Sequence, residues 1–197
     1  MNRPTIVLAS TSRYRRELLE RLRLAFDVEA PHVDESPLEG EAPRATALRL
    51  AIAKAQEVQS RRPGAVVIGS DQVAEIDGAA LGKPMTHSAA LVQLERMQGK
   101  SVIFHTALAV AGPGRHALQV ESVPTTVLMR TLPRAALEHY LRLDEPYDCA
   151  GAAKIESLGI ALVASVEATD PTALIGLPLI RLTAMLANAG IEVLSPS

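Results

Sequence analysis

The sequence contains a single cysteine, Cys149, and no tryptophan. One cysteine excludes a disulfide within the chain and a zinc site built from cysteines, and it suits a reducing compartment such as the cytoplasm. Aromatic residues make up only 3% of the chain, too few for a platform on which single-stranded nucleic acid stacks its bases. The core must therefore be built mainly from leucine, valine, isoleucine and alanine.

An excess of positive charge and a long apolar run are also missing. The formal net charge is −2, so the broad basic surface that binds duplex nucleic acid is not expected. No apolar run approaches the ~20 residues of a membrane-spanning helix, and residues 1–4 lead into a strand pattern without the features of a signal peptide. We expect a soluble cytoplasmic protein that binds neither duplex nucleic acid nor membrane.

Helical and strand patterns alternate at both ends of the chain, and the middle is rich in strands. We expect helices directly after Ser12 and over residues 43–60, 88–97, 133–143 and 178–189. Strands are expected before Ser10 and over residues 26–30, 65–70, 73–76, 102–111, 117–129 and 160–166. This order predicts an α/β fold with a mixed sheet flanked by helices, in two lobes with a cleft between them.

Three turns follow from glycine and proline. Gly112-Pro113-Gly114 would join the two long middle strands into an extended hairpin, Asp77-Gly78 would form a second hairpin, and Gly190 would end the last helix. At 197 residues the chain fits one domain, or one domain with an inserted lobe. We expect a single domain over residues 1–197, with a β-rich hairpin lobe at about residues 101–130.

A hydroxyl-rich turn, Ser10-Thr11-Ser12, joins the first strand to the first helix. The backbone N–H groups of such a turn and the positive end of the helix dipole attract an anion, and Arg15 and Arg16 add full charges. The turn therefore suggests a phosphate site. Two plainer interpretations stay open: Ser12 as an ordinary N-cap and the arginines as a solvated helix face.

Four further charged residues lie where chemistry is expected. Asp71 follows an apolar strand, at the end where open α/β sheets bind ligands, and Glu35 lies in an acidic loop. Lys54 lies in the middle of a helical pattern, and Lys83 lies in Gly82-Lys83-Pro84. Taken singly, each has a plainer interpretation, as a turn aspartate, a solvated loop acid or a surface lysine.

Several familiar sites are excluded by their spacing. The glycines match neither a P-loop nor a dinucleotide fingerprint, the five histidines show no pair at zinc-helix spacing, and no G-x-S-x-G elbow presents a nucleophile. What remains is two carboxylates and several cations on four segments. That set suits metal-assisted attack of water on a phosphoanhydride better than acyl transfer.

Six short motifs then occur in order: Leu8-Ala-Ser-Thr-Ser12 with Arg15-Arg16, Val33-Asp-Glu35, Lys54-Ala55, Gly69-Ser-Asp71, Gly82-Lys-Pro84 and Gly176-Leu-Pro178. In this order the sequence resembles the Maf family of nucleoside triphosphate pyrophosphatases over nearly its whole length. The resemblance implies an inosine-triphosphatase-like fold, a divalent cation, Mg²⁺ or Mn²⁺, and cleavage between the α and β phosphates to give a nucleoside monophosphate and pyrophosphate. A homodimer would also fit the family.

The resemblance, together with the chemistry of the side chains, implies a role for each site residue. Asp71 and Glu35 would hold the metal and orient the attacking water, with Asp71 as the general base. The triphosphate would be held by Ser10, Ser12, Arg15, Lys54 and Lys83.

The sequence resembles the branch of the family that hydrolyses 7-methyl-GTP. The resemblance rests on Tyr14, on Gln72 and on the segment that contains Cys149-Ala-Gly151, Lys154 and Glu156. It implies that Tyr14, Gln72 and Glu156 set the specificity for the base. Methylation at N7 makes guanine cationic, so Tyr14 could stack on it for ~0.5 to 2 kcal/mol. Glu156 could accept hydrogen bonds from the guanine N1 and N2 groups. Two plainer interpretations also stay open here: Tyr14 as a cover of the core, and Glu156 as a partner of Lys154.

Three departures from the family pattern leave the substrate preference open: Arg13 in place of proline, Ala107 in place of glycine and Ala152 in place of serine. Two other functions are compatible with the same residues. One is a nucleotide sensor without turnover that regulates cell division and septum formation. The other is a capped-RNA binder, which would also use Tyr14 and Glu156 but is disfavoured by the acidic charge balance.

Overall fold

The computed structural model describes residues 4–113 and 118–194. Within these residues seven strands form one sheet in the order β2-β1-β3-β5-β6-β7, with β4 paired to β3 beside this path. The strands are β1 (Ile6–Ala9), β2 (Asp27–Glu29), β3 (Val66–Ile76), β4 (Ala79–Leu81), β5 (Ser101–Ala111), β6 (Leu118–Met129) and β7 (Val163–Ala168). The predicted mixed α/β sheet is confirmed.

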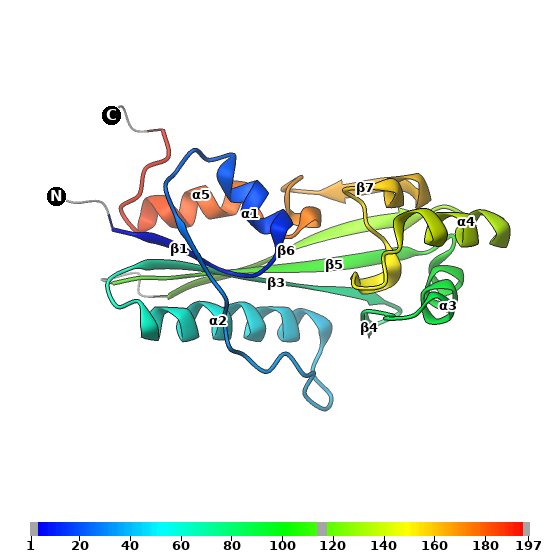
Figure 1. Cartoon of the computed structure of the whole chain (residues 1–197), viewed down its shortest axis with the longest axis horizontal. Helices are drawn as coiled ribbons and strands as arrows, with labels where there is room; N and C mark the ends of the chain where they lie inside the picture. Colours follow the sequence, from blue (N-terminus) through cyan, green and yellow to red (C-terminus); the bar gives the residue numbers. More distant parts are fainter. Residues whose placement is uncertain (1–3, 114–117, 195–197) are drawn as a thin grey trace.

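The helices cover both faces and one end of this sheet. They are α1 (Arg13–Glu20), α2 (Pro43–Arg61), α3 (His87–Met97), α4 (Arg134–Asp144) and α5 (Leu179–Asn188), with short 3-10 helices η1 (Ala150–Ala152), η2 (Leu158–Leu162) and η3 (Ala173–Ile175). Helices α1 and α5 lie on one face and α2 on the other, while α3 and α4 gather at the far end (Figure 1). In the described residues, no helix has both the length and the apolar character needed to cross a bilayer.

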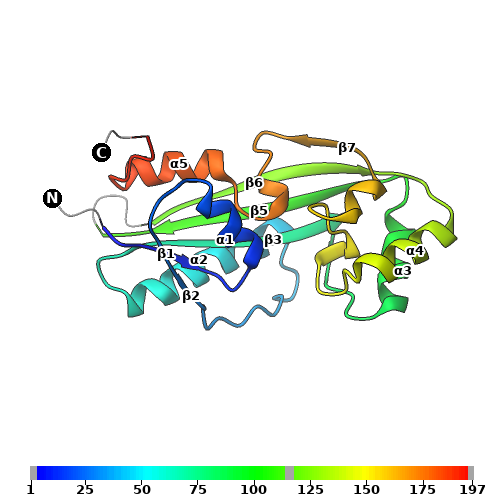
Figure 2. The same cartoon turned by 45° about the horizontal axis from the view of Figure 1, so that its top comes forward.

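The long antiparallel strands connect the two ends of the molecule. β1 pairs in parallel with β2 and β3, whereas β3, β5, β6 and β7 pair antiparallel. β5 and β6 extend from beneath α5 to the end where α4 lies (Figure 2). Separate hydrophobic clusters form at the two ends, one around Leu18, Leu182 and Leu186 and the other around Leu94, Phe104 and Leu141.

The prediction of two strands flanking Asp71 is wrong, because β3 runs without a break from Val66 to Ile76. Asp71 lies within the strand and pairs with Ala107 of β5. A carboxylate is tolerated at this buried position because a lysine neutralises it. The strand end at this place belongs to β1, whose last residue, Ala9, pairs with Gly69.

Two smaller differences concern the second half of the chain. Residues 160–162, predicted as the start of a strand, belong to η2, and β7 begins only at Val163, where pairing with β6 starts. The apolar run is typical of a strand, but the chain before it is folded back tightly. A Cβ atom at Gly159 would lie only 2.5 Å from the Lys154 backbone oxygen. The predicted hairpin turn includes Gly114, and the second long strand was predicted to start at residue 117; both positions lie outside the described residues.

Helix ends agree with the local sequence. Gly190, with φ of +81°, takes the position after the last helical residues of α5. Its N–H donates to the Ala187 carbonyl at 2.9 Å, and the Ile191 N–H donates to the Leu186 carbonyl at 2.8 Å. These bonds satisfy carbonyl groups that the helix end leaves unpaired.

Candidate active site

A gap in strand pairing opens beside β3 at the carboxyl end of β1. β1 pairs with β3 as far as Gly69, and β4 pairs with β3 only from Ala74 onward. On this edge, no described strand pairs with residues 70–73. The turn that begins at Ser10 follows β1 directly into this gap, which is the position where parallel strands of α/β sheets bind ligands.

A buried lysine joins two carboxylates on the α2 side of the gap. Lys54 of α2 is 5% exposed. Its Nζ atom lies 2.6 Å from Asp71 Oδ1 and 2.6 Å from Glu35 Oε1. A buried ammonium group needs such partners, because an unpaired charge away from water is very costly. The interpretation of Lys54 as a surface lysine is therefore wrong, and three segments distant in sequence meet here.

The electrostatic field around Glu35 is positive. Partial burial raises the pKa of Glu35, but the hydrogen bond and charge of Lys54 and the charges of Lys83 and Arg15 outweigh it, so that the pKa is lowered overall. Lys83 itself is exposed and follows β4. Glu35 therefore stays ionised at neutral pH and remains free to attract a cation.

Arg15 lies on the other side of the gap. Its Nε–H donates to the Gly176 carbonyl at 3.0 Å. Burial lowers the pKa of the guanidinium, and the charges of Asp71 and Glu35 oppose that effect. In the described residues, the terminal amino groups of Arg15 have no hydrogen-bond or ion-pair partner, which leaves them available to an anion. We call Glu35, Lys54, Asp71, Arg15 and Lys83 the charged site.

The solvated-face interpretation is correct for Arg16 but not for Arg15. Arg16 pairs with Glu20 at 3.0 Å on the exposed face of α1. Arg13, one of the departures from the family pattern, pairs in the same way with Glu17 at 2.6 Å.

Ser10 and Ser12 shape the turn by hydrogen bonds. The Ser12 hydroxyl accepts from the Arg15 N–H at 3.4 Å as the N-cap of α1, and the buried Ser10 hydroxyl accepts from the Ser12 N–H at 3.1 Å. The interpretation of Ser12 as the N-cap of α1 is thus correct. The N–H groups of Arg13 and Tyr14, at the first turn of α1, have no acceptor among the described residues, so an anion could still bind there.

Tyr14 and Glu156 are 142 positions apart in the sequence, yet they lie near enough in the fold for the charge of Glu156 to act on the Tyr14 hydroxyl. Burial raises the pKa of Tyr14, and the charges of Lys154 and Glu156 act on it in opposite directions. Burial also raises the pKa of Glu156, against the smaller effect of Lys154. No ion pair between Glu156 and Lys154 forms within the described residues, so the pairing interpretation is not supported.

An apolar cavity of about 410 Å³ adjoins Glu156. Its lining is one carboxylate among apolar residues: Ile155, Glu156, Ile160, Val166, Ala168, Pro171, Leu174 and Ile175. We call it the Glu156 cavity. Apolar walls with a single polar anchor are typical of sites that hold a flat organic ring.

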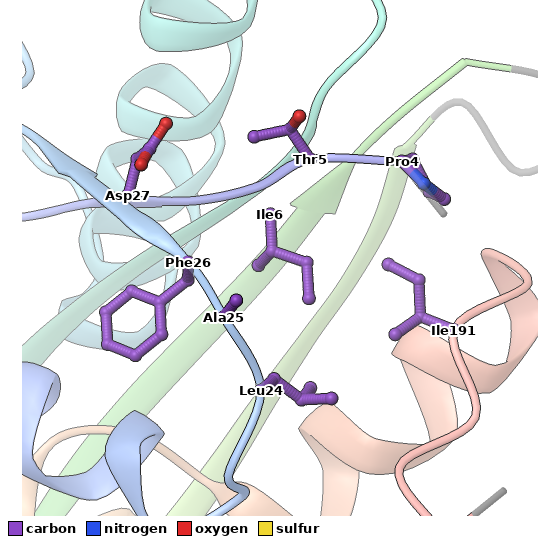
Figure 3. Close-up of a pocket in the computed structure, with 8 residues that line it drawn as sticks. All are labelled: Pro4, Thr5, Ile6, Leu24, Ala25, Phe26, Asp27 and Ile191. Atoms are coloured by element: carbon purple, nitrogen blue, oxygen red, sulfur yellow. The ribbon is translucent and has the colours of Figure 1, made fainter. Parts of the chain in front are cut away.

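A second cavity, of about 350 Å³, lies elsewhere (Figure 3). It adjoins Ile6, at the amino end of β1, together with Phe26 and Ile191. Every residue predicted for the site lies outside its lining. Because the turn and the charged site are at the opposite end of β1, this cavity is not a candidate for the same chemistry.

Gln72 is partly buried, and its amide is held by hydrogen bonds. Its Nε2 atom lies 2.9 Å from Thr106 Oγ1 and 3.1 Å from the carbonyl oxygens of both Ala173 and Leu174. These acceptors occupy its amide hydrogens, so Gln72 fixes η3 and, through Leu174, one wall of the Glu156 cavity. Nothing in the sequence indicated Ser70, which lies beside Asp71 in the same motif. Its hydroxyl lies within hydrogen-bond distance of the Gly176 carbonyl oxygen, directly after η3.

The donor set suits a magnesium-type cation and not a zinc-type centre. Asp71 and Glu35 each offer a second carboxylate oxygen that has no partner among the described residues. In the part of the chain that the structure describes, no group of three or more histidine, cysteine, aspartate or glutamate residues could hold a metal. Mg²⁺ commonly binds through one or two carboxylates and completes its shell with water and substrate phosphates.

Comparison with known proteins extends over nearly the whole chain. The family model described as "Maf-like protein" matches residues 5–189. A Thiobacillus denitrificans protein named "7-methyl-GTP pyrophosphatase" is 56% identical over 192 residues, which cover 98% of this chain and 96% of the relative. A Methylobacillus flagellatus protein of the same name is 54% identical, with 97% of this chain and 100% of the relative covered.

Among solved structures, the Staphylococcus aureus Ham1 protein aligns with a TM-score of 0.45 and 16% identity, over 64% of this chain and 71% of Ham1. The sequence comparisons are far more extensive. From the match of the family model and relatives more than half identical over nearly their full length, this chain belongs to the Maf family.

Proposed function

We propose that this protein is a metal-dependent nucleoside triphosphate pyrophosphatase whose substrate is 7-methyl-GTP. The reaction would cleave the anhydride between the α and β phosphates and release a nucleoside monophosphate and pyrophosphate. The observation that carries the proposal is the buried Lys54 bonded to both Asp71 and Glu35 beside the open edge of β3. The names of the relatives support the same reaction and favour it over a sensor without turnover.

The charged site supplies what anhydride hydrolysis needs. Asp71 orients a water molecule, whose proton passes to the Asp71 carboxylate as the water oxygen forms a bond to phosphorus and the bridging P–O bond breaks. Because a nearby cation lowers the basicity of a carboxylate, positioning of the water is the larger contribution of Asp71. Lys54, Arg15 and Lys83 stabilise the negative charge of the triphosphate and of the departing pyrophosphate. Ser10 and Ser12 contribute by shaping the turn whose N–H groups face the same anion.

Asp71 and Glu35 would hold Mg²⁺ or Mn²⁺ through their second oxygens. When bound there, a divalent cation would neutralise phosphate charge and make the phosphorus easier to attack. Because Lys54 is already bonded to both carboxylates, it keeps their first oxygens in place and leaves the second ones for the cation.

Base recognition is assigned to the Glu156 cavity. Tyr14, which lies near Glu156 but outside the lining of this cavity, would stack on the cationic 7-methylguanine for ~0.5 to 2 kcal/mol. Glu156 would accept hydrogen bonds from the N1 and N2 groups of the base. Gln72 acts through the cavity wall that its amide holds, rather than by touching the base.

The test is a panel of triphosphates, including 7-methyl-GTP, GTP, UTP and TTP, assayed for pyrophosphate with Mg²⁺ and with Mn²⁺. We expect the highest kcat/KM for 7-methyl-GTP. Without a divalent cation we expect no release of pyrophosphate. Binding without turnover of any triphosphate would support a nucleotide sensor in cell division instead. Tighter binding of a cap carrying a longer RNA tail would favour the capped-RNA interpretation.

Three expectations from the sequence stay predictions: one domain over residues 1–197, a homodimer and a cytoplasmic location. Light scattering of the purified protein tests the dimer. Fractionation of cells that express the chain tests the location.

A further inference from the structure

The segment from Asp170 to Pro178, the 170–178 loop, connects β7 to α5 and is fixed at its base. Asp170 is 1% exposed. Its carboxylate accepts from the Thr172 N–H at 3.0 Å, the Thr172 hydroxyl at 2.6 Å and the Ile180 N–H at 2.8 Å. The Thr172 hydroxyl also accepts from the Leu179 N–H at 2.8 Å. The loop is therefore tied to the start of α5.

The same loop contacts both halves of the proposed substrate site. Pro171, Leu174 and Ile175 line the Glu156 cavity. The next residue, Gly176, accepts the Nε–H of Arg15 at 3.0 Å. Gly176 has φ of +119°, a conformation that favours glycine, while a Cβ there would meet Arg15 only at an ordinary 3.5 Å. Glycine is thus required by the backbone turn that brings the carbonyl to Arg15.

Strand β3, which carries Asp71, also forms side-chain hydrogen bonds with this loop. Successive side chains of a strand point to opposite faces, so Ser70 and Gln72 point away from the face on which Asp71 meets Lys54. Ser70 is 0% exposed. Its single hydroxyl proton is shared between two carbonyl acceptors, the Gly176 oxygen at 2.9 Å and the Ala107 oxygen at 2.8 Å. Ser70 and Gln72, the two chain neighbours of Asp71, therefore both form hydrogen bonds with carbonyl oxygens of the 170–178 loop.

We propose that the 170–178 loop couples the Glu156 cavity to the charged site, with Ser70 as the positioning residue. A ring that fills the cavity packs against Leu174 and Ile175, which fixes the Gly176 carbonyl and hence Arg15. The phosphate groups and the base then bind cooperatively, by the same factor in both directions. This inference rests on the proposed function, because it takes Arg15 as a phosphate ligand.

Calorimetry with two probes measures this coupling without turnover. The affinity for pyrophosphate is measured in the presence of Mg²⁺, with and without saturating 7-methylguanosine, a nucleoside that has no phosphate to hydrolyse. We expect the nucleoside to tighten pyrophosphate binding about fivefold or more, the lower end of common coupling between sites. A wild-type protein in which the factor stays near one overturns the coupling, whatever any variant does.

Ser70→Ala removes the hydroxyl that holds Gly176, and we expect the coupling factor to fall below about two. Ser122→Ala is the matched control, because the Ser122 hydroxyl on β6 is also buried and has no hydrogen-bond partner among the described residues. It should keep the wild-type factor. Ile175→Ala is a second variant that removes packing at the cavity and leaves every hydrogen bond of the loop in place; it should lower the factor as well.

Steady-state kinetics separates positioning from a general loss of structure. With 7-methyl-GTP, Ser70→Ala should lower kcat about tenfold while KM changes less than about threefold, because Gly176, whose carbonyl orients Arg15, loses a hydrogen bond while the cavity remains. An unchanged kcat, or equal losses for Ser70→Ala and Ser122→Ala, overturns the positioning role. Absence of both pyrophosphate binding and turnover in the wild type overturns the proposed function, whereas turnover without coupling overturns only this inference.

Discussion

The charged site and the Glu156 cavity recognise a nucleotide by opposite means. The charged site presents three cationic side chains and two carboxylates, and its central ion pairs are 2.6 Å long. The cavity presents apolar walls and one carboxylate. Charges act on any triphosphate alike, whereas an apolar cavity discriminates by shape and by its single anchor. Substitutions within either site should therefore change mainly one of the two properties, catalysis or base selectivity, whereas substitutions that loosen the 170–178 loop should change both.

The two glutamates show this difference in their acidity. The charge of Lys54 and its neighbours lowers the pKa of Glu35 overall, although partial burial opposes them. Burial raises the pKa of Glu156, because the cavity removes water and supplies little compensating charge. The same side-chain type is thus held as an anion in one region and brought closer to neutrality in the other.

The largest effect is expected for Asp71→Asn in the charged site. Turnover should fall on the order of a thousandfold for every triphosphate, because the amide can neither accept the proton nor bind the cation as well. Base selectivity should stay unchanged. Steady-state kinetics with 7-methyl-GTP and UTP measures both quantities.

The control for this variant is Asp77→Asn. Asp77 is exposed in the β3–β4 turn at φ of +51°, which asparagine adopts readily, so both the fold and the activity should persist. Near-normal turnover of Asp71→Asn would remove Asp71 from the mechanism.

A smaller and selective effect is expected for Glu156→Gln. Loss of a charge-assisted hydrogen bond costs ~1.5 to 3 kcal/mol, so kcat/KM for 7-methyl-GTP should fall by about tenfold or more. The value for UTP should change little. Glu167→Gln on the neighbouring β7, where the side chain is exposed, provides the matched control. Equal losses for both substrates would mean that Glu156 acts on the fold and not on the base.

Acidification should remove selectivity before it removes activity. A carboxyl group with a raised pKa takes up its proton at a higher pH than usual, and one with a lowered pKa stays ionised to a lower pH. As the pH falls toward and below ~4.3, the ordinary value for glutamate, Glu156 is protonated first and Glu35 later. The 7-methyl-GTP to UTP ratio of kcat/KM should thus drop several-fold while UTP turnover persists.

Glu156→Gln provides the control for this pH profile, because its selectivity should be low and independent of pH. Lys154, Asp144 and Asp148 also act on Glu156, but burial is the largest cause of its shift. Selectivity and turnover that decline together would contradict the difference between the two glutamates.

The smallest effect concerns Ser12, where the N-cap and phosphate interpretations are still to be separated. Ser12→Ala should lower stability by ~1 kcal/mol, or Tm by about 2–4 °C for a chain of this size. Ser12→Asp keeps the cap but adds a negative charge, which at ~4 Å costs about 1 kcal/mol in water against a phosphate. Thermal melts and KM for two triphosphates give both readouts.

If Ser12 adjoins the phosphates, Ser12→Asp should keep the wild-type Tm and raise KM about fivefold for both substrates. An unchanged KM would leave Ser12 as a helix cap alone.

Local pattern was enough for much of the fold. The helices over 43–60, 88–97, 133–143 and 178–189 were predicted to within a few residues, because apolar spacing and end signals are properties of neighbouring residues. The break at Asp71 was predicted wrongly, since a polar residue in an apolar run reads as a strand end unless its partner is known. That partner, Lys54, lies 17 positions away.

The family, the mixed α/β class and the set of charged residues could be read from the sequence alone, because ordered motifs and periodicity are carried by the chain. Which of the charges are buried and paired depends on the tertiary structure. Arg15 reaches the Gly176 carbonyl across 161 positions, and Ser70 reaches it across 106. Such contacts depend on how α1, β3 and the 170–178 loop pack together, and no local pattern encodes that packing.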